Sequence, residues 1–226
     1  MGAAFLQQFT DYSSSEADQD LRGILGAALS ADWRMGLVAR GFGWHTDVGT
    51  FSTPAAGGGV AAVIDQDRPN LLISVAAGYC LVPLRVHVCA QMPLGATDSD
   101  ESEILIAADI AAAAAGITTQ TTVETPSNMR TNTASGCPAT VLSTLSATIT
   151  SPTLGMEMGH AVKIFETKTD VGVLWSDLTL LYEPVCPPLL IGPCALYVYH
   201  GGTVATTGFI NADFLVFASS LVTDLS

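Results

Sequence analysis

The amino-acid sequence predicts an all-β protein, an antiparallel sandwich or barrel preceded by a short N-terminal helical arm. Three observations point to this class. Apolar and polar residues alternate in several segments beyond residue 33, turn-forming clusters separate these segments, and no sustained helical pattern follows residue 35. Roughly eight to ten strands at this spacing are typical of a sandwich or barrel. We expect an arm over residues 1–32 and a single β-domain over residues 33–226.

The arm carries the pattern of one amphipathic helix. Ser13 and Glu16 form a capping box in SSSEADQDLRGILGAALS, and acidic residues fill the first turn. Leu21, Ile24 and Leu25 then fall on one face. An isolated helix of this length is marginal in water, so we expect this face to dock on the domain or on a neighbouring subunit.

Alternation is clearest in residues 84–91 and 207–219. In LRVHVCAQ every second residue from Leu84 to Ala90 is apolar, which predicts a half-buried strand. The last strand, TGFINADFLVFAS, is expected to point Ile210, Ala212, Phe214 and Val216 inward and to expose Asn211 and Asp213. Further strands are expected in 145–150, 160–167 and 173–182, and from 104 to about 110, and the polar stretch 118–139 is expected to be a long exposed loop.

Charge and apolar content narrow the classes of partner. Eight Lys and Arg stand against 21 Asp and Glu, a formal net charge of −13, and the basic residues are scattered singly. Because a nucleic-acid backbone is neutralised by clustered cations, we expect no direct nucleic-acid binding.

Only 13% of residues are charged while 49% are hydrophobic, against about 25% charged in a typical soluble domain. This apolar surplus indicates either a large core or contacts with other chains, and we favour the contacts. The most apolar run, 104–117, is too short to span a membrane, and residues 1–12 lack the pattern of a secretory signal.

The segment PPLLIGPCALYVYHGG, residues 187–202, is apolar on both faces of a predicted strand. Leu196 points to one side, and Tyr197 and Tyr199 point to the other. Such a strand needs cover on both faces, and few helices are available to provide it. The flanking prolines cannot donate ladder hydrogen bonds, so the strand is expected to begin at a loop or sheet edge. We therefore expect Leu196, Tyr197 and Tyr199 to be buried against other subunits, together with Leu21, Ile24 and Leu25.

Motifs for catalysis or cofactor binding do not emerge, and we expect neither an enzyme nor a cofactor. The sequence has no phosphate-binding GxxxxGK[ST], no GxSxG and no closely spaced histidine pair.

His45 and Asp47 in GWHTDVG are read as part of a loop, with a metal pair as the weaker alternative. The acidic run from Asp98 to Glu103 is read as a solvated hairpin tip, because it lacks the glycine and glutamate positions of a calcium loop. Five cysteines without CxxC spacing are expected to be reduced and mostly buried, although a Cys186–Cys194 disulfide stays open.

The C-terminal half resembles the closing strands of a jelly roll. It has a strand ending in LLYEP, a proline-rich crossover VCPPLLIGP, the strand CALYVYHGG, the turn TVATTG and a last long strand. With the helical arm and the acidic β-domain, this order resembles the single jelly-roll capsid and virion structural proteins of viruses and bacteriophages. The resemblance is one of architecture over residues 33–220. Unlike many capsid proteins, this chain has no basic arm, since only Arg22 and Arg34 lie near its start.

The resemblance implies a structural subunit of a virus or phage particle, a capsid or virion-surface protein made in the host cytoplasm and located in the virion. Its expected partners are copies of itself, as a trimer or a larger shell assembled through apolar strand edges, and other virion proteins. Two alternatives use the same fold. One is a trimeric receptor- or carbohydrate-binding head or decoration protein, and the other is a cupin-like enzyme, which would need a histidine-rich metal site.

Overall fold

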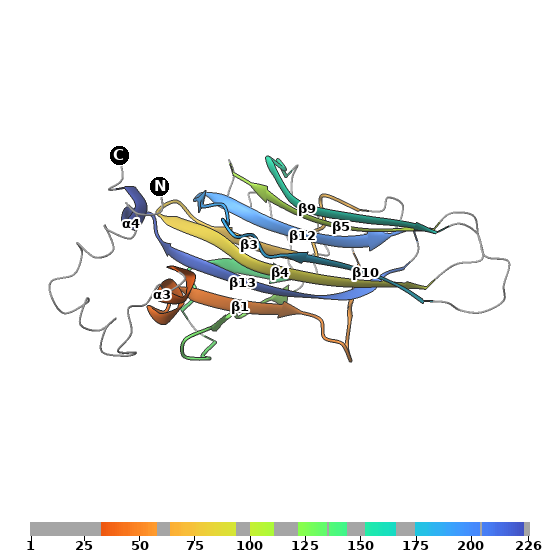
Figure 1. The fold of residues 1–226 in the computed structure, drawn as a ribbon, viewed down its shortest axis with the longest axis horizontal. Helices are drawn as coiled ribbons and strands as arrows, with labels where there is room; N and C mark the ends of the chain where they lie inside the picture. Colours follow the sequence, from red (N-terminus) through yellow and green to blue (C-terminus); the bar gives the residue numbers. More distant parts are fainter. Residues whose placement is uncertain are drawn as a thin grey trace.

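The computed structural model describes residues 33–57, 64–93, 100–110, 122–134, 136–143, 152–165, 175–203 and 205–223. These residues form two antiparallel β-sheets packed face to face, with two short helices at one end (Figure 1). The prediction of an all-β sandwich is confirmed. The predicted arm helix and the predicted strand at 145–150 lie outside the described residues.

The elements follow the chain in this order. The strands are β1 (Gly43–Val48), β2 (Ala55–Ala56), β3 (Leu71–Val75), β4 (Tyr79–Pro93), β5 (Asp100–Asp109), β6 (Thr122–Val123), β7 (Ser127–Asn128), β8 (Thr140–Ser143), β9 (Met156–Phe165), β10 (Trp175–Tyr182), β11 (Leu190–Ile191), β12 (Cys194–Gly202) and β13 (Thr207–Ala218). The helices are α3 (Trp33–Ala39) and α4 (Ser220–Thr223).

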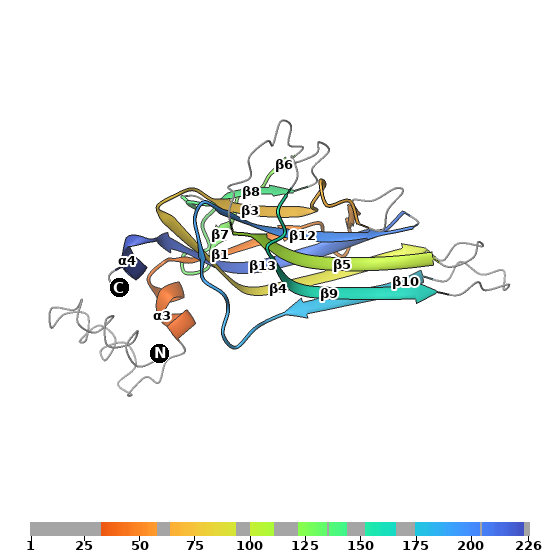
Figure 2. The same ribbon diagram turned by 90° about the horizontal axis from the view of Figure 1, so that it is seen from above.

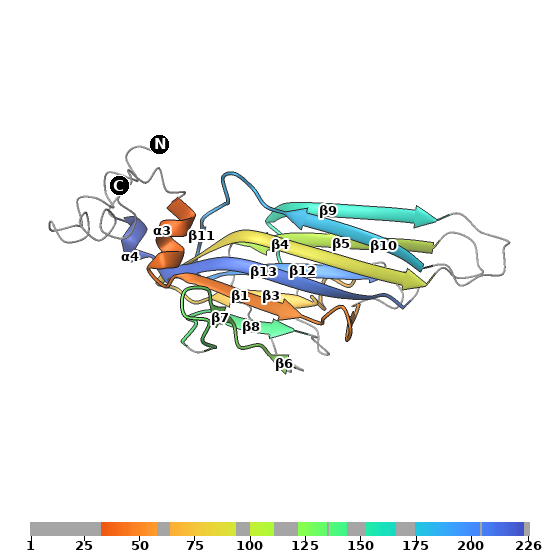
Figure 3. The ribbon, with the colours of Figure 1, turned by 60° about the horizontal axis from the view of Figure 1, so that its bottom comes forward.

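Sheet A has the order β10-β4-β13-β1-β7, with β11 also paired to β4 and β2 to β13 (Figure 3). Sheet B has the order β6-β8-β3-β12-β5-β9 (Figure 2). Eight strands have five or more residues: β1, β3, β4, β5, β9, β10, β12 and β13. These eight pair from the outside of the chain inwards. The first pairs with the last (β1 with β13), the second with the seventh (β3 with β12), the third with the sixth (β4 with β10) and the fourth with the fifth (β5 with β9).

The long central strands of sheet A follow the predicted alternation along most of the predicted segments. On β4 the side chains of Val86, Val88 and Ala90 are buried in the core, whereas Arg85 is exposed and His87 is half-buried. Leu84, predicted to share the face of Val86, is buried on the outer face instead, because the register with β13 shifts beside it. On β13 the four residues predicted to point inward are buried, while Asn211 and Asp213 are half-buried rather than fully exposed. Period-two patterning works here because each strand has one face on the core and one on the outside.

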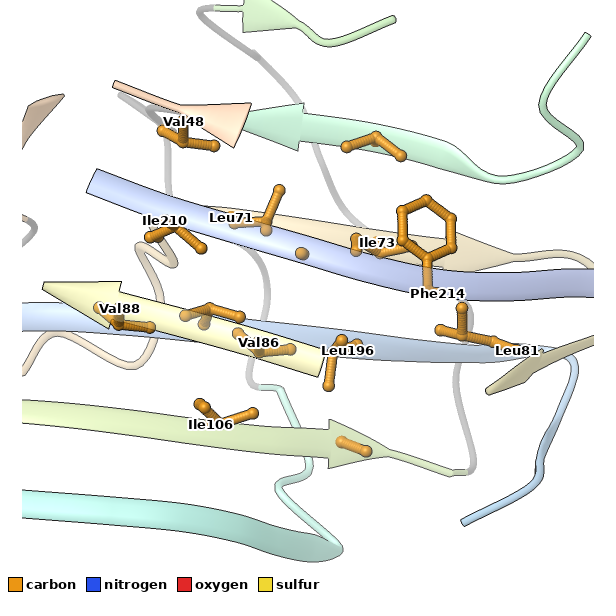
Figure 4. Packing of buried hydrophobic residues seen from close by; sticks show 14 of the residues in the cluster. Val48, Leu71, Ile73, Leu81, Val86, Val88, Ile106, Leu196, Ile210 and Phe214 are labelled. Atoms are coloured by element: carbon orange, nitrogen blue, oxygen red, sulfur yellow. The ribbon is translucent and has the colours of Figure 1, made fainter. Parts of the chain in front are cut away.

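The main core fills the space between the sheets. Sheet A contributes residues such as Val86, Val88, Ile210 and Phe214, and sheet B contributes Leu71, Ile73, Ile106 and Leu196 (Figure 4). Every one of these eight side chains is fully buried. Because burying a large aliphatic side chain is worth about 1.5–3 kcal/mol, this layer dominates the cohesion of the sandwich.

A second apolar cluster lies on the outer face of sheet A, the face turned away from sheet B. There Cys80, Val82, Leu84, Leu215 and Phe217 are covered by Leu37 of α3, with Trp33, Val38 and Val222 packed alongside. The sequence pattern placed the change to strands at Trp33. The structure corrects this, because residues 33–39 form a helix that caps one end of the sheet. The sequence feature that indicates this helix is the spacing of Trp33 and Leu37, which lie one helical turn apart.

Candidate contact surfaces and polar sites

Strand β12 is buried on both faces, as its composition indicated, but its cover comes from its own chain. All nine residues from Cys194 to Gly202 are buried. Leu196 belongs to the core between the sheets. Tyr197 and Tyr199 lie on the outer face of sheet B, where they are only 2% and 1% exposed.

The cover over the two tyrosines includes the segment before β3. The Tyr199 hydroxyl donates a hydrogen bond to the Gln66 carbonyl at 2.9 Å, and Ile64 and Leu154 pack against the same cluster. Burial raises the pKa of Tyr197 to about 12 and that of Tyr199 still further. Leu196, Tyr197 and Tyr199 are thus already buried on the single chain, and their contact with other subunits stays a prediction. Leu21, Ile24 and Leu25 lie outside the described residues, so their role stays a prediction.

Exposed apolar side chains instead gather at the end of the molecule that carries α3. Met35 on α3 is 69% exposed and Val185 is 85% exposed. Arg34 ties these two regions together, because its Nη2 donates hydrogen bonds to the carbonyls of Pro184 (2.8 Å) and Val185 (2.5 Å). Ile191 of β11, also exposed, pairs with Cys80 beside the cluster under α3. We call Met35, Val185, Leu189 and Ile191 the end surface; Figure 3 shows α3 and β11 at this end.

The second candidate contact surface is strand β9, the edge of sheet B. It is ten residues long, contains no proline, and pairs only with β5 among the described strands. Val162 and Ile164 point from it to the outside, and Ile164 is 65% exposed. Strand β10 of sheet A lies alongside β9, and Lys163 Nζ donates to the Asp177 carbonyl at 3.2 Å. The candidate contact surface is therefore the outer face of β9, where apolar side chains are exposed.

A polar cluster occupies the outer face of sheet A, where β1 and β13 run side by side. The ring of His45 lies between two carboxylates, with Nδ1 2.6 Å from Asp213 Oδ1 and Nε2 2.9 Å from Asp47 Oδ2. Asn211 donates a further hydrogen bond to Asp47. The reading of His45 and Asp47 as loop residues is wrong, because both lie in strand β1.

This geometry favours a charged imidazole. Both ring nitrogens face carboxylate oxygens, which accept but do not donate, so only the imidazolium satisfies both bonds. Although burial opposes the charge, the hydrogen bonds to Asp213 and Asp47 and their negative charges prevail and raise the pKa of His45 above 6.5. The cluster acts as a brace between the two strands. Among the described residues, no three His, Cys, Asp or Glu side chains are grouped in a way that could hold a metal ion.

The acidic run from Asp98 to Glu103 is not a hairpin tip over its described part. Residues 100–103 begin strand β5, and Asp100 and Ser102 are buried. Glu103 accepts a hydrogen bond from His160 Nε2 at 2.5 Å. DESE contains no apolar residue, so no alternation of apolar and polar residues marked these positions as a strand.

The five cysteines are free thiols, so the Cys186–Cys194 disulfide that the sequence left open does not form. Cys80 and Cys194 are buried, whereas Cys186 is exposed. Burial raises the pKa of Cys137 to about 11 and that of Cys194 to about 12, so these two thiols stay protonated at neutral pH and serve as small apolar side chains.

No protein-family model, no curated protein and no solved structure matches this chain. Neither helix in the described part of the chain has the length and apolar character needed to cross a membrane.

Proposed function

We propose that this protein is a structural subunit of a virus or phage particle, a capsid or virion-surface protein that assembles with copies of itself. The observation that carries the proposal is the order in which the eight long strands pair. The first pairs with the eighth, the second with the seventh, the third with the sixth and the fourth with the fifth.

This nested pairing is what a long antiparallel hairpin produces when it is wrapped into two sheets. The four pairs are then joined by β13 lying beside β4 in sheet A and β12 beside β5 in sheet B. We infer a jelly roll from this order, an eight-stranded double sheet found in viral capsid proteins, lectins and cupins. Because one fold serves several functions, the surfaces must choose among them.

The exposed apolar side chains favour a particle subunit within this group. The end surface and the β9 edge expose apolar side chains on two separate groups of elements, which suits a subunit with more than one neighbour. The net charge of −13 argues against a subunit that holds nucleic acid directly. Stable contacts of this kind bury on the order of 1,000 Å² or more, with apolar centres and polar rims.

Negative-stain electron microscopy of the purified protein, together with a glycan array, tests the proposal. Rings, sheets or closed shells built from repeated subunits would support it. A discrete trimer that binds glycans in a calcium-dependent way would instead favour the receptor-binding head. Turnover of a substrate with stoichiometric iron or manganese would overturn the proposal in favour of a cupin-like enzyme.

A further inference from the structure

His200 is buried at the end of β12 without any hydrogen-bond partner for its ring. The residue is 0% exposed, and neither Nδ1 nor Nε2 has a partner. Only its backbone is tied, because the His200 N–H donates to Asn70 Oδ1 at 2.7 Å. An unpaired polar ring inside a core is costly to keep and is tolerated best in its neutral form.

Two glycines make room for this ring. A Cβ on Gly57 would lie 3.2 Å from His200 Nδ1, and a Cβ on Gly208 would lie 3.2 Å from His200 Cε1. A side chain at position 208 would also clash with β4, because the same Cβ would lie 2.4 Å from the Cys89 carbonyl oxygen. The backbone at Gly57 and at Gly208 therefore lies close to the ring, which has no exposed surface.

Residues 55–57, which we call the cover segment, lie beside the His200 ring and are held in place by few hydrogen bonds. Ala55 and Ala56 pair with the first two residues of β13, and the Gly57 N–H donates to the Thr206 carbonyl at 2.8 Å. Asn70 Nδ2 donates to the Ala56 carbonyl at 3.1 Å. Since β2 is only two residues long, this segment can separate from β13 without disturbing the long strands.

The charged groups near the ring do not stabilise its protonated form. Glu103 of β5 is engaged with His160 on the outer face, and Asp65 before β3 forms an ion pair with Arg68. Burial alone lowers the pKa of His200, to about 4. The other titratable residues on the elements around the ring are Asp67 before β3, Asp100 and Glu101 on β5, and His87 and Cys89 on the outer face of β4.

We propose that His200 makes the cover segment an acid-sensitive latch. Protonation of the ring places an unpaired charge beneath residues 55–57, and the segment then leaves β13 and Asn70 while the two sheets stay packed. The released end gives the imidazolium access to water, which is the energetic gain that drives opening. This device is independent of the proposed role in a particle.

Hydrogen exchange of the full chain between pH 7 and pH 4.5 tests the latch, with rates corrected for intrinsic exchange. We expect the protection of the Gly57 amide to fall by about tenfold per pH unit below pH 6, because the open form binds one more proton. The amides of Val86 and Val88 in β4 should keep their protection over the same range. Simultaneous loss at Gly57 and in β4 would overturn the proposal.

Two variants and a matched control separate His200 from the other histidines. His200→Met removes the titrating ring at similar volume, and His200→Gln is a second replacement that does not titrate. In either variant the Gly57 protection should no longer depend on pH in this range. His160→Gln, which removes an exposed imidazole, should behave like the native chain. A pH dependence of the Gly57 protection that persists without His200 would contradict the latch. If neither variant folds, the proposal is decided by comparing the protection of Gly57 with that of β4 in the native chain.

Discussion

At the scale of single residues, two side chains show how context decides a role that type alone does not. Tyr199 sits in a stretch whose apolar character predicted a subunit contact, but its hydroxyl donates to Gln66 within the chain and its ring is covered. His45 looked like a loop residue, but it joins carboxylates from two strands. Asp213 lies 168 residues away from His45, so no local pattern could have predicted the contact.

Tyr199→Phe tests whether the tyrosine stabilises the single chain. The change removes the hydrogen bond to Gln66 and leaves the ring in place, so the free energy of unfolding should fall by about 1 kcal/mol. Chemical denaturation measures this value, and Tyr79→Phe, at an exposed tyrosine, is the control with little expected change. Unchanged stability together with weaker self-association would show that Tyr199 is an interface residue after all.

The brace around His45 predicts a specific dependence on pH. Its pKa is raised in the folded chain, so its stabilising effect is complete below pH 6.5 and is lost as the pH rises through the folded value. The native chain should lose stability from pH 6.5 to pH 8 relative to His45→Gln, by less than about 1 kcal/mol because the site is partly exposed. Thermal melts across this range provide the measurement. Parallel profiles for the two chains would refute the charged brace.

At the scale of elements, alternation predicted β4 and β13 well because each has one face on the core. It failed to say what covers β12, since a strand apolar on both faces looks the same whether its cover is a loop or another subunit. It also missed α3, a single helix of seven residues without an acidic first turn. The end surface was not found either, because its exposed apolar residues, such as Met35 and Val185, come from separate segments.

Ile164→Lys tests the β9 edge as a contact between subunits. A charge placed on the exposed side of this strand should weaken self-association by roughly tenfold or more, about 1.4 kcal/mol, without changing the unfolding of the single chain. Light scattering against concentration measures the effect. Phe51→Lys is the matched control, because Phe51 is exposed in the loop after β1, away from both surfaces. An equal effect of both variants would argue against a role for the edge.

At the scale of the whole molecule, the sequence supports the sandwich, its acidic charge and the absence of a basic stripe along the chain. The nested pairing of the eight long strands depends on contacts between the two ends of the chain, such as β1 with β13, and only the three-dimensional structure supplies them. The end surface likewise brings α3 together with residues about 150 positions later through Arg34. Sites made by distant segments are the part that sequence patterns could not give.

Self-association is the central claim, and sedimentation velocity over a wide range of protein concentration tests it most directly. We predict that the sedimentation coefficient rises with concentration towards one or more defined assemblies, since the end surface and the β9 edge leave apolar side chains exposed on the single chain. A single species with the mass of one 23.4 kDa chain at every concentration would contradict the account.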